Sequence, residues 1–255
     1  MRLGAYDALM AQRPSTESYA AGDGRIGVLF VHGFTGSPAS LRTWAERTAA
    51  AGYRVSLPRL PGHGTRWEDL AVTSWQDWYA CVERAFAELK ASCDQVFVAS
   101  LSMGGALSLM LAEKRPSEVA GLMLVNPAVT VASPLVPLSG VLKHVVKSVK
   151  GIANDAVLDI DEGAYERTPI ASVHAMYKLW GELRPYLDLV ECPLVIFRSA
   201  VDHVVPPASV EIITRQVSSA EVTEHVLANS YHVATMDNDA DFIIDTSLEF
   251  LAAHS

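Results

Sequence analysis

Cysteine is scarce in this sequence and does not occur in pairs. The 255 residues include three cysteines, Cys81, Cys93 and Cys192, and no two of them form a CxxC motif. An odd number of widely spaced cysteines fits neither a disulfide framework nor a cysteine-based zinc site. We therefore expect reduced cysteines that pack as small apolar side chains, and we expect no metal centre.

Long apolar runs are also missing. No stretch reaches the roughly 18 residues that a membrane-spanning helix requires. The N-terminal residues lack the basic region, apolar stretch and small-residue cleavage site of a secretory signal. These absences predict a cytoplasmic protein with no transmembrane segment.

Basic residues are outnumbered by acidic ones. The chain has 20 Lys and Arg against 29 Asp and Glu, which gives a formal net charge of −9. Because an acidic chain repels the phosphate backbone, we expect no nucleic-acid partner. The charge balance places no restriction on a neutral small-molecule substrate.

The sequence does contain a regular alternation of strand-like and helix-like segments. Short continuous apolar runs are typical of strands buried on both faces of a parallel sheet. Such runs occupy Ile26–Val31, Tyr53–Leu57, Val96–Ala99, Leu122–Val125, Leu194–Phe197 and Val222–Leu227, and helical patterns occupy Ala39–Ala51, Ser74–Ala91, Ser102–Arg115 and Asp241–Ala252. This order predicts an α/β fold with a mostly parallel central sheet flanked by helices, preceded by a polar lead-in over residues 1–25. Ligands of such sheets bind at the carboxyl ends of the strands.

The stretch from Pro127 to Pro193 is far longer than one crossover helix needs. Structureless loops of that length are uncommon. We predict a small helical cap over residues 133–188 and assign residues 1–132 and 189–255 to the core. The apolar side chains predicted to share one helical face of the cap are Leu138, Val141, Leu142, Val145, Val149 and Ile152, with Lys143, Lys147 and Lys150 off that face. This face packs on the main domain, and part of it could line an acyl-chain site or touch a lipid surface.

The main chemical signal is the segment Ser100-Leu101-Ser102-Met103-Gly104-Gly105. It lies directly after a strand-like run and directly before a helical pattern, which is the setting of a nucleophile elbow. The sharp turn of an elbow requires small residues two positions before and after the nucleophile. Gly104 meets this requirement, whereas Ser100 stands where G-x-S-x-G has glycine. We therefore predict that Ser102 is a nucleophile in an imperfect but tolerated elbow.

Two backbone amides are candidates for an oxyanion hole. The amide of Met103 would lie at a helix start above the Ser102 hydroxyl. The second candidate is the amide of Phe34, in a turn made possible by Gly33 and Gly36 after the first strand. Two histidines follow strands nearby, His32 and His63, and we interpret both as structural.

A serine hydroxyl needs a base, and the base needs a carboxylate to orient it. Among eight histidines, His232 is best placed, because it follows the last strand-like run and a polar turn. Asp202 follows the strand Leu194–Phe197 at the edge where ligands bind, whereas Asp188 and Glu191 precede that strand. The order Ser102, Asp202, His232 is the order of α/β-hydrolase triads.

Several further segments strengthen this interpretation. They are VHGFTGSPASLR (31–42), GYRVSLPRLPGHGTRWEDL (52–70), LSMGGALSLMLAE (101–113), AYERTP (164–169), DHVVPP (202–207) and NSYHVATMDND (229–239). In combination they resemble the α/β-hydrolase family, and more narrowly the bacterial monoacylglycerol lipases and their carboxylesterase relatives. The resemblance implies a serine esterase with Ser102, Asp202 and His232 as triad and with the amides of Phe34 and Met103 as oxyanion hole. It also implies a small cap over a hydrophobic acyl tunnel, and no cofactor.

The resemblance further implies that polar groups of the cap bind a glycerol headgroup, and Glu162 aligns with such a position. A carboxylate there could accept hydrogen bonds from two glycerol hydroxyls. The alternative is that Glu162 is a solvated surface acid.

Three functions remain in competition. The first is hydrolysis of monoacylglycerol to fatty acid and glycerol, and the second is a broad carboxylesterase activity on short- to medium-chain esters. The third is a non-catalytic hydrolase-fold module that binds a lipid or a protein, which the complete triad disfavours. The partner expected in the first two cases is a small lipid ester, and the cap could also make transient contact with a membrane or lipid surface.

Overall fold

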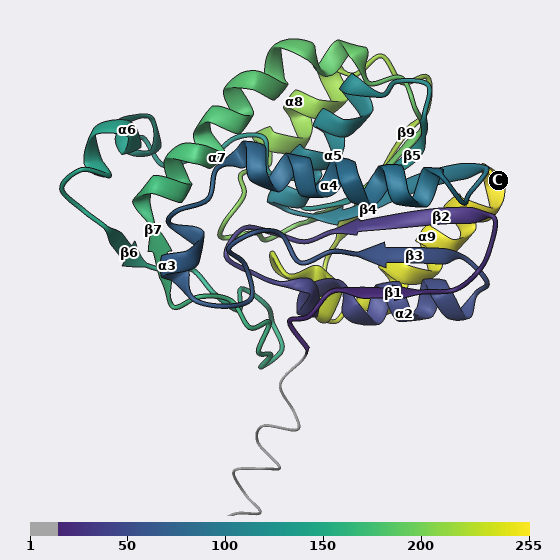
Figure 1. Cartoon of the computed structure of the whole chain (residues 1–255), viewed down its shortest axis with the longest axis horizontal. Helices are drawn as coiled ribbons and strands as arrows, with labels where there is room; N and C mark the ends of the chain where they lie inside the picture. Colours follow the sequence, from purple (N-terminus) through teal and green to yellow (C-terminus); the bar gives the residue numbers. More distant parts are fainter. Residues whose placement is uncertain (1–14) are drawn as a thin grey trace, which may run out of the picture.

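The apolar runs become neighbouring strands of one seven-stranded sheet (Figure 1). The computed structural model describes residues 15–255. In spatial order the strands are β1 (Tyr19–Ala21), β3 (Arg54–Leu57), β2 (Ile26–Val31), β4 (Gln95–Leu101), β5 (Val119–Val125), β8 (Leu194–Ser199) and β9 (Val222–Leu227). Within this sheet, as far as residues 15–255 show, only the β1–β3 pairing is antiparallel. The carboxyl ends of the other strands therefore meet at one edge of the sheet.

Helices cover both faces of the sheet (Figure 1). One layer consists of α4 (Trp75–Lys90), α5 (Met103–Lys114), α7 (Ile170–Leu183) and α8 (Ala208–Gln216), whose apolar residues share one core cluster. On the other face lie α2 (Arg42–Ala50) and α9 (Ala240–Ala253), which contribute to the second cluster. The chain is thus an α/β protein with a mostly parallel sheet between two layers of helices, as the sequence predicts.

The differences from the expected elements have local causes. The helix expected over Ala39–Ala51 is divided into a 3₁₀ turn at Pro38–Leu41 and α2, with Ser37 capping the turn. By contrast, Ser74 caps α4 in a complete capping box with Asp77, as its place in the sequence suggests. The expected polar lead-in contains the short edge strand β1, and its first 14 residues lie outside the described part of the chain.

The segment predicted as a cap contains mixed short elements. These are a 3₁₀ turn (Val136–Leu138), α6 (Ser139–Leu142), the hairpin strands β6 (Ser148–Lys150) and β7 (Arg167–Pro169), and α7. The prediction of one apolar helical face from Leu138 to Ile152 is wrong, because the helix ends at Leu142. Glycine at 140 and four valines between 141 and 149 disfavour helix, and β-branched residues favour the hairpin that forms instead.

The remaining short elements are α3 (Trp67–Leu70), a 3₁₀ helix over Arg184–Leu189 and a 3₁₀ turn over Ala234–Met236. Among residues 15–255, no helix combines the length and the hydropathy needed to cross a membrane.

Candidate active site

Ser102 occupies a strained turn between β4 and α5. Its backbone has φ +56° and ψ −120°, a conformation that L-residues rarely adopt. The turn is fixed by the amide of Ser102, which donates to the carbonyl of Val125 at 3.0 Å, and by the carbonyl of Ser102, which accepts from the amides of Gly105 and Ala128. A Cβ at Gly104 would lie 2.0 Å from the Val31 carbonyl oxygen, so position 104 admits only glycine without a backbone shift. This is the geometry of a nucleophile elbow.

Ser100 fits into the elbow, but its hydroxyl does not find a partner. The side chain is fully buried, and among the described residues no group hydrogen-bonds to its Oγ. A buried hydroxyl without a partner destabilises a fold by about 1–3 kcal/mol. Serine in place of glycine at position 100 therefore fits sterically, but its unpaired hydroxyl lowers the free energy of unfolding.

Asp202 and His232 are directly hydrogen-bonded. His232 Nδ1 lies 2.8 Å from Asp202 Oδ2, and the backbone amides of Val204 and Val205 donate to Asp202 Oδ1 at 2.8 Å each. Burial by itself raises the pKa of the Asp202 carboxyl, but the hydrogen bonds and the charge of His232 outweigh burial, so the pKa is lowered. Asp202 is thus a carboxylate that can orient the imidazole and stabilise its protonated form.

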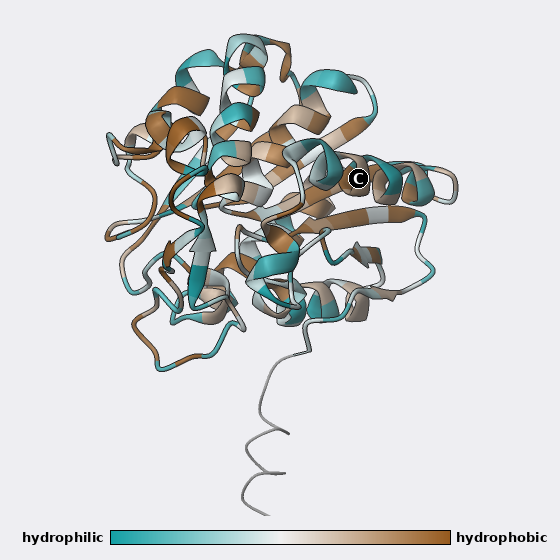
Figure 2. Cartoon of the chain, turned by 60° about the vertical axis from the view of Figure 1, so that its left-hand side comes forward, coloured by the Kyte–Doolittle hydropathy of each residue, from teal (hydrophilic) through white to brown (hydrophobic). Residues whose placement is uncertain are grey.

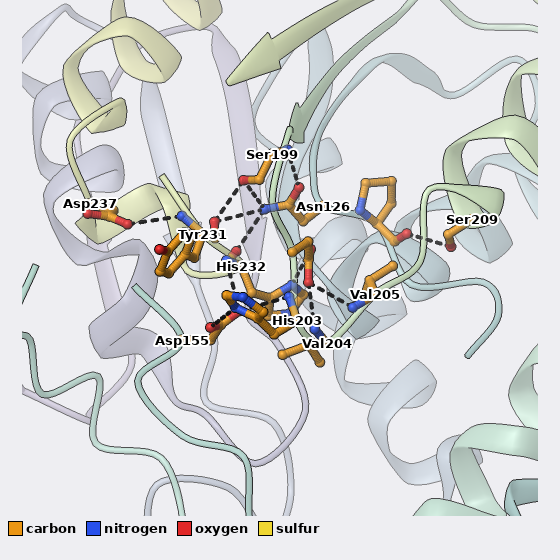
Figure 3. A network of polar contacts seen from close by, with 12 residues as sticks. Asn126, Asp155, Ser199, His203, Val204, Val205, Ser209, Tyr231, His232 and Asp237 are labelled. Carbon is orange, nitrogen blue, oxygen red and sulfur yellow. Dashed lines mark hydrogen bonds and ion pairs between the residues drawn. The ribbon is translucent and has the colours of Figure 1, made fainter. Parts of the chain in front are cut away.

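The loop that carries His232 is held against the sheet by a residue that the sequence does not single out. Asn126 follows β5 with φ +43°. Its Nδ2 donates to the carbonyl of His232 at 2.8 Å and to the hydroxyl of Ser199, and its Oδ1 accepts from the amide of Ser199 at 2.8 Å (Figure 3). Its position at the carboxyl end of a strand, directly before Pro127, is the signal that could have identified it.

The turn after β2 runs alongside the serine. A Cβ at Gly33 would lie 3.4 Å from Ser102 Cβ, so the backbone leading to Phe34 passes close to Ser102. Met103, the other expected oxyanion residue, is the first residue of α5. Both amides therefore belong to segments that border Ser102, and their role stays a prediction.

His32 and His63 are buried, and Nδ1 of His63 contacts the carbonyl of Pro61 at 3.0 Å. His32 Nδ1 contacts the carbonyl of Gly33, and its Nε2 accepts from the amide of Leu60 at 3.1 Å. Burial lowers the pKa of His32 to about 4 and that of His63 to about 3, so both side chains are neutral near pH 7. His32 thereby links the turn after β2 to the loop after β3.

A cavity of about 430 Å³ opens at Ser102. Ser102, His232 and Glu162 all line it, and apolar side chains supply most of its wall. The apolar lining from the segment 133–188 includes Leu135, Val136, Leu142, Val146, Val149, Ile152, Ile170, Val173, Met176 and Trp180. An apolar cavity of this kind, with a few polar groups at one end, can hold an alkyl chain with its polar end near Ser102.

Glu162 is buried rather than solvated. Its side chain belongs to a residue that is 8% exposed, and the amide of Asn154 donates to its Oε1 at 2.8 Å. Burial raises the pKa of the Glu162 carboxyl, and the hydrogen bond from Asn154 and the charge of His232 partly oppose that rise. A Cβ at Gly36 would lie 3.7 Å from its Oε2, which puts the second oxygen beside the turn that carries Phe34.

The sequence of this chain is similar to those of known hydrolases. A family model described as serine aminopeptidase, S33, matches residues 23–239. A thermostable monoacylglycerol lipase from Bacillus sp. (strain H-257) is 44% identical over 241 residues, which cover 94% of this chain and 95% of the lipase. A carboxylesterase from Bacillus subtilis (strain 168) is 27% identical over 93% of this chain and 96% of its own length.

The fold is also shared with solved structures. A chain from work on LipS and LipT, two metagenome-derived lipolytic enzymes, superposes with a TM-score of 0.91 at 39% identity and covers 94% of this chain and 99% of its own.

Proposed function

The chain belongs to the S33 serine aminopeptidase family of α/β hydrolases, and from this premise we propose that it hydrolyses monoacylglycerol to fatty acid and glycerol. The observation that carries the proposal is the combination of a hydrogen-bonded Asp202–His232 pair with a buried carboxylate, Glu162, in one apolar cavity beside Ser102. Ser102 and the Asp202–His232 pair would carry out ester hydrolysis. Glu162 would bind the polar headgroup of the alcohol.

The proposed reaction proceeds through an acyl-enzyme. Ser102 Oγ attacks the ester carbonyl while His232 accepts the hydroxyl proton, and the amides of Phe34 and Met103 stabilise the oxyanion. His232 then donates that proton to the departing glycerol oxygen. Water, deprotonated by His232, attacks the acyl-Ser102 ester. His232 returns this proton to the departing Ser102 Oγ, which releases the fatty acid and restores the free enzyme. Asp202 holds the imidazole throughout and stabilises its cation.

Selectivity for monoacylglycerol would depend on Glu162. A buried carboxylate strongly favours a ligand that donates hydrogen bonds to it, because an unpaired buried acceptor is costly. The free hydroxyls of a monoacylglycerol can donate, whereas a methyl ester has no hydroxyl to offer. The relative named as a monoacylglycerol lipase, with 44% identity, supports this choice of substrate.

The alternative is a carboxylesterase that accepts short- to medium-chain esters without regard to the alcohol. The relative named as a carboxylesterase, with 27% identity, supports it. In that case Glu162 would serve only to hold the loop through its contacts with Asn154.

We also propose that the cap segment contacts the surface of substrate aggregates or membranes. Apolar side chains are exposed on it, among them Val141 (73% exposed) and Val145 (79% exposed). Figure 2 brings forward the left-hand side of Figure 1, where α6 and β6 lie, and shows brown, hydrophobic stretches on that side. Such a cluster of exposed apolar residues marks an interaction surface.

The test compares one acyl group on different alcohols. We would measure hydrolysis of a medium-chain monoacylglycerol, its methyl ester and the diacylglycerol by the wild-type protein, Ser102→Ala and Glu162→Gln. We expect a preference for the monoacylglycerol, no turnover by Ser102→Ala, and at least about a 10-fold loss of the preference in Glu162→Gln, because a charged acceptor is removed. Equal rates on the methyl ester would favour the carboxylesterase, and turnover by Ser102→Ala would refute the mechanism.

A further inference from the structure

A short loop of the cap segment, residues 154–162, lies against both loops that hold the Asp202–His232 pair. We call it the clamp loop. Its Asp155 carboxylate makes three contacts there. Asp155 Oδ1 lies 2.8 Å from Nδ1 of His203, and Oδ2 accepts from the backbone amides of His203 (3.2 Å) and His232 (3.3 Å) (Figure 3). One carboxylate thus touches the residue next to Asp202 and the backbone of His232 itself.

The backbone of the clamp loop adds a further bond. The amide of Val233, directly after His232, donates to the carbonyl oxygen of Asp155 at 2.9 Å. Residue 155 therefore binds two consecutive amides of the His232 loop, one with its side chain and one with its main chain. The Asp155 side chain is only 13% exposed, so solvent competes little for these bonds.

A second carboxylate, Asp237, also joins the two segments, but here the carboxylate belongs to the segment after His232 and the amides belong to the clamp loop. Asp237, from the segment after His232, is buried and accepts from the amides of Val157 and Leu158 in the clamp loop at 2.7 and 3.2 Å. It also accepts from the amide of Tyr231 at 3.1 Å. The clamp loop and the His232 loop thus each supply a carboxylate that binds backbone amides of the other.

The position of these bonds matters for the reaction. Asp202 follows β8 and His232 follows β9, so their 2.8 Å contact depends on two separate loops keeping their relative position. Asn126 holds the His232 loop to β8 from the sheet side through the His232 carbonyl. Asp155 binds the same loop through the His232 amide and ties it to the residue after Asp202. A displacement of about 1 Å at reacting groups can lower a rate about 100-fold.

We propose that Asp155 is a positioning residue that keeps His232 aligned with Asp202 and Ser102, so that correct seating of the cap segment is a condition for catalysis. The proposal rests on the triad role put forward above. Asp155 also lines the cavity, but its contact with His232 is to the backbone amide and not to the imidazole. Glu162 and Asn154, at the two ends of the clamp loop, are hydrogen-bonded to each other. The loop that would bind the alcohol headgroup through Glu162 would therefore also position His232 through Asp155.

The experiment uses the full chain and a soluble p-nitrophenyl ester, which has no glycerol and therefore does not depend on the headgroup proposal. We expect Asp155→Ala to lower kcat about 10- to 100-fold with KM changed less than about twofold. Asp155→Asn retains one oxygen for the two backbone amides and should restore kcat to within about threefold of wild type. Asp159→Ala is the matched control, because Asp159 is an exposed carboxylate of the same loop.

Two further measurements separate positioning from a general loss of structure. The NMR signal of the His232 Nδ1 proton, which lies between the imidazole and Asp202, should broaden or disappear in Asp155→Ala and persist in Asp159→Ala. Asp155→Glu keeps the charge but moves the carboxylate by one methylene, so it should also lower kcat. This variant tests the proposal even if Asp155→Ala does not fold.

An unchanged kcat in Asp155→Ala and Asp155→Glu, with Ser102→Ala inactive, would overturn the positioning role and leave the proposed function intact. A raised KM with unchanged kcat would overturn it as well, because it would assign Asp155 to substrate binding. Turnover by Ser102→Ala would instead refute the proposed function, and this inference with it.

Discussion

At the scale of single residues, a few neighbouring atoms determine which side chains fit on either side of Ser102. Gly104 has no room for a side chain, because a Cβ would meet the Val31 carbonyl at 2.0 Å. On the other side of Ser102, the Ser100 hydroxyl fits but is buried without a partner in the described structure. The elbow thus tolerates a small side chain two positions before Ser102, at residue 100, and no side chain two positions after it, at residue 104.

Replacing Ser100 by alanine should stabilise the protein. The change removes the unpaired buried hydroxyl and keeps the Cβ, so we expect a gain of about 1 kcal/mol in the free energy of unfolding. A gain of that size corresponds to about 2–4 °C in Tm for a chain of this length. Thermal unfolding of both proteins measures it, with Ser108→Ala as control, because the Ser108 hydroxyl is buried but hydrogen-bonded to the Gly104 carbonyl. A Tm equal to or below that of wild type would contradict this account of Ser100.

At the residue level, the information that the sequence offers about the site lies in the order of residues along the chain. The sequence brings Ser102, Asp202 and His232 to notice because each follows a strand and their order matches known triads. It could not indicate Asp155 as a neighbour of His232, since the bond joins residues 77 positions apart and Asp155 lies in a segment without regular structure. The burial of Glu162 depends likewise on how that segment folds back.

At the scale of elements, the buried parts of the molecule are the predictable ones. Strand β2 occupies the predicted residues 26–31, and it is buried from residue 27 to residue 31, because a buried strand leaves an apolar run with polar ends. The segment with α6 and β6 could not be predicted in this way. Its apolar residues divide between the cavity and solvent, so no single period describes them.

Helix α5 is buried almost throughout, and its last residue but one is a buried acid, Glu113. Its Oε2 has no hydrogen-bond partner among the described residues, and burial raises the pKa of this carboxyl from 4.5 to about 7. Because the folded state holds the proton more tightly than the unfolded chain, the contribution of Glu113 to stability is complete below about pH 4.5. It is lost as the pH rises through about 7.

The variant Glu113→Gln should therefore be more stable than wild type in alkaline solution. At pH 8 we expect an advantage of about 1–3 kcal/mol, based on about 1.4 kcal/mol for each unit of pKa difference. At pH 5 the advantage should nearly disappear. Urea unfolding at both pH values measures it, with Glu118→Gln as control, since Glu118 is half-exposed and paired with Arg115. An advantage that does not change with pH would contradict the role assigned to Glu113.

At the scale of the whole molecule, charge and apolar surface are distributed unevenly. The chain has a net charge of −9, yet Lys143, Lys147 and Lys150 lie within the same short segment as the exposed Val141 and Val145. Basic side chains next to exposed apolar ones favour an anionic lipid surface, whereas the rest of the acidic molecule is repelled by it. Contact through the cap segment would bring the cavity, which Leu142 and Val146 line, next to the lipid.

This arrangement predicts that the protein binds vesicles of phosphatidylcholine with phosphatidylglycerol more strongly than vesicles of phosphatidylcholine alone, and less strongly as salt is added. The double variant Val141→Ser, Val145→Ser should bind about 5- to 30-fold more weakly, at roughly 1 kcal/mol of apolar burial lost for each valine. Cosedimentation measures both effects. The matched control is Val226→Ser, an exposed valine of the edge strand β9.

The same double variant should leave hydrolysis of a dissolved p-nitrophenyl ester unchanged. Val141 and Val145 are outside the lining of the cavity in the described structure, so the approach of a dissolved ester to Ser102 does not involve them. Turnover of monoacylglycerol presented in vesicles should fall together with binding. If the double variant cosediments as wild type does, the contact surface lies elsewhere. If dissolved ester turnover falls as well, these valines support the cavity instead of the lipid contact.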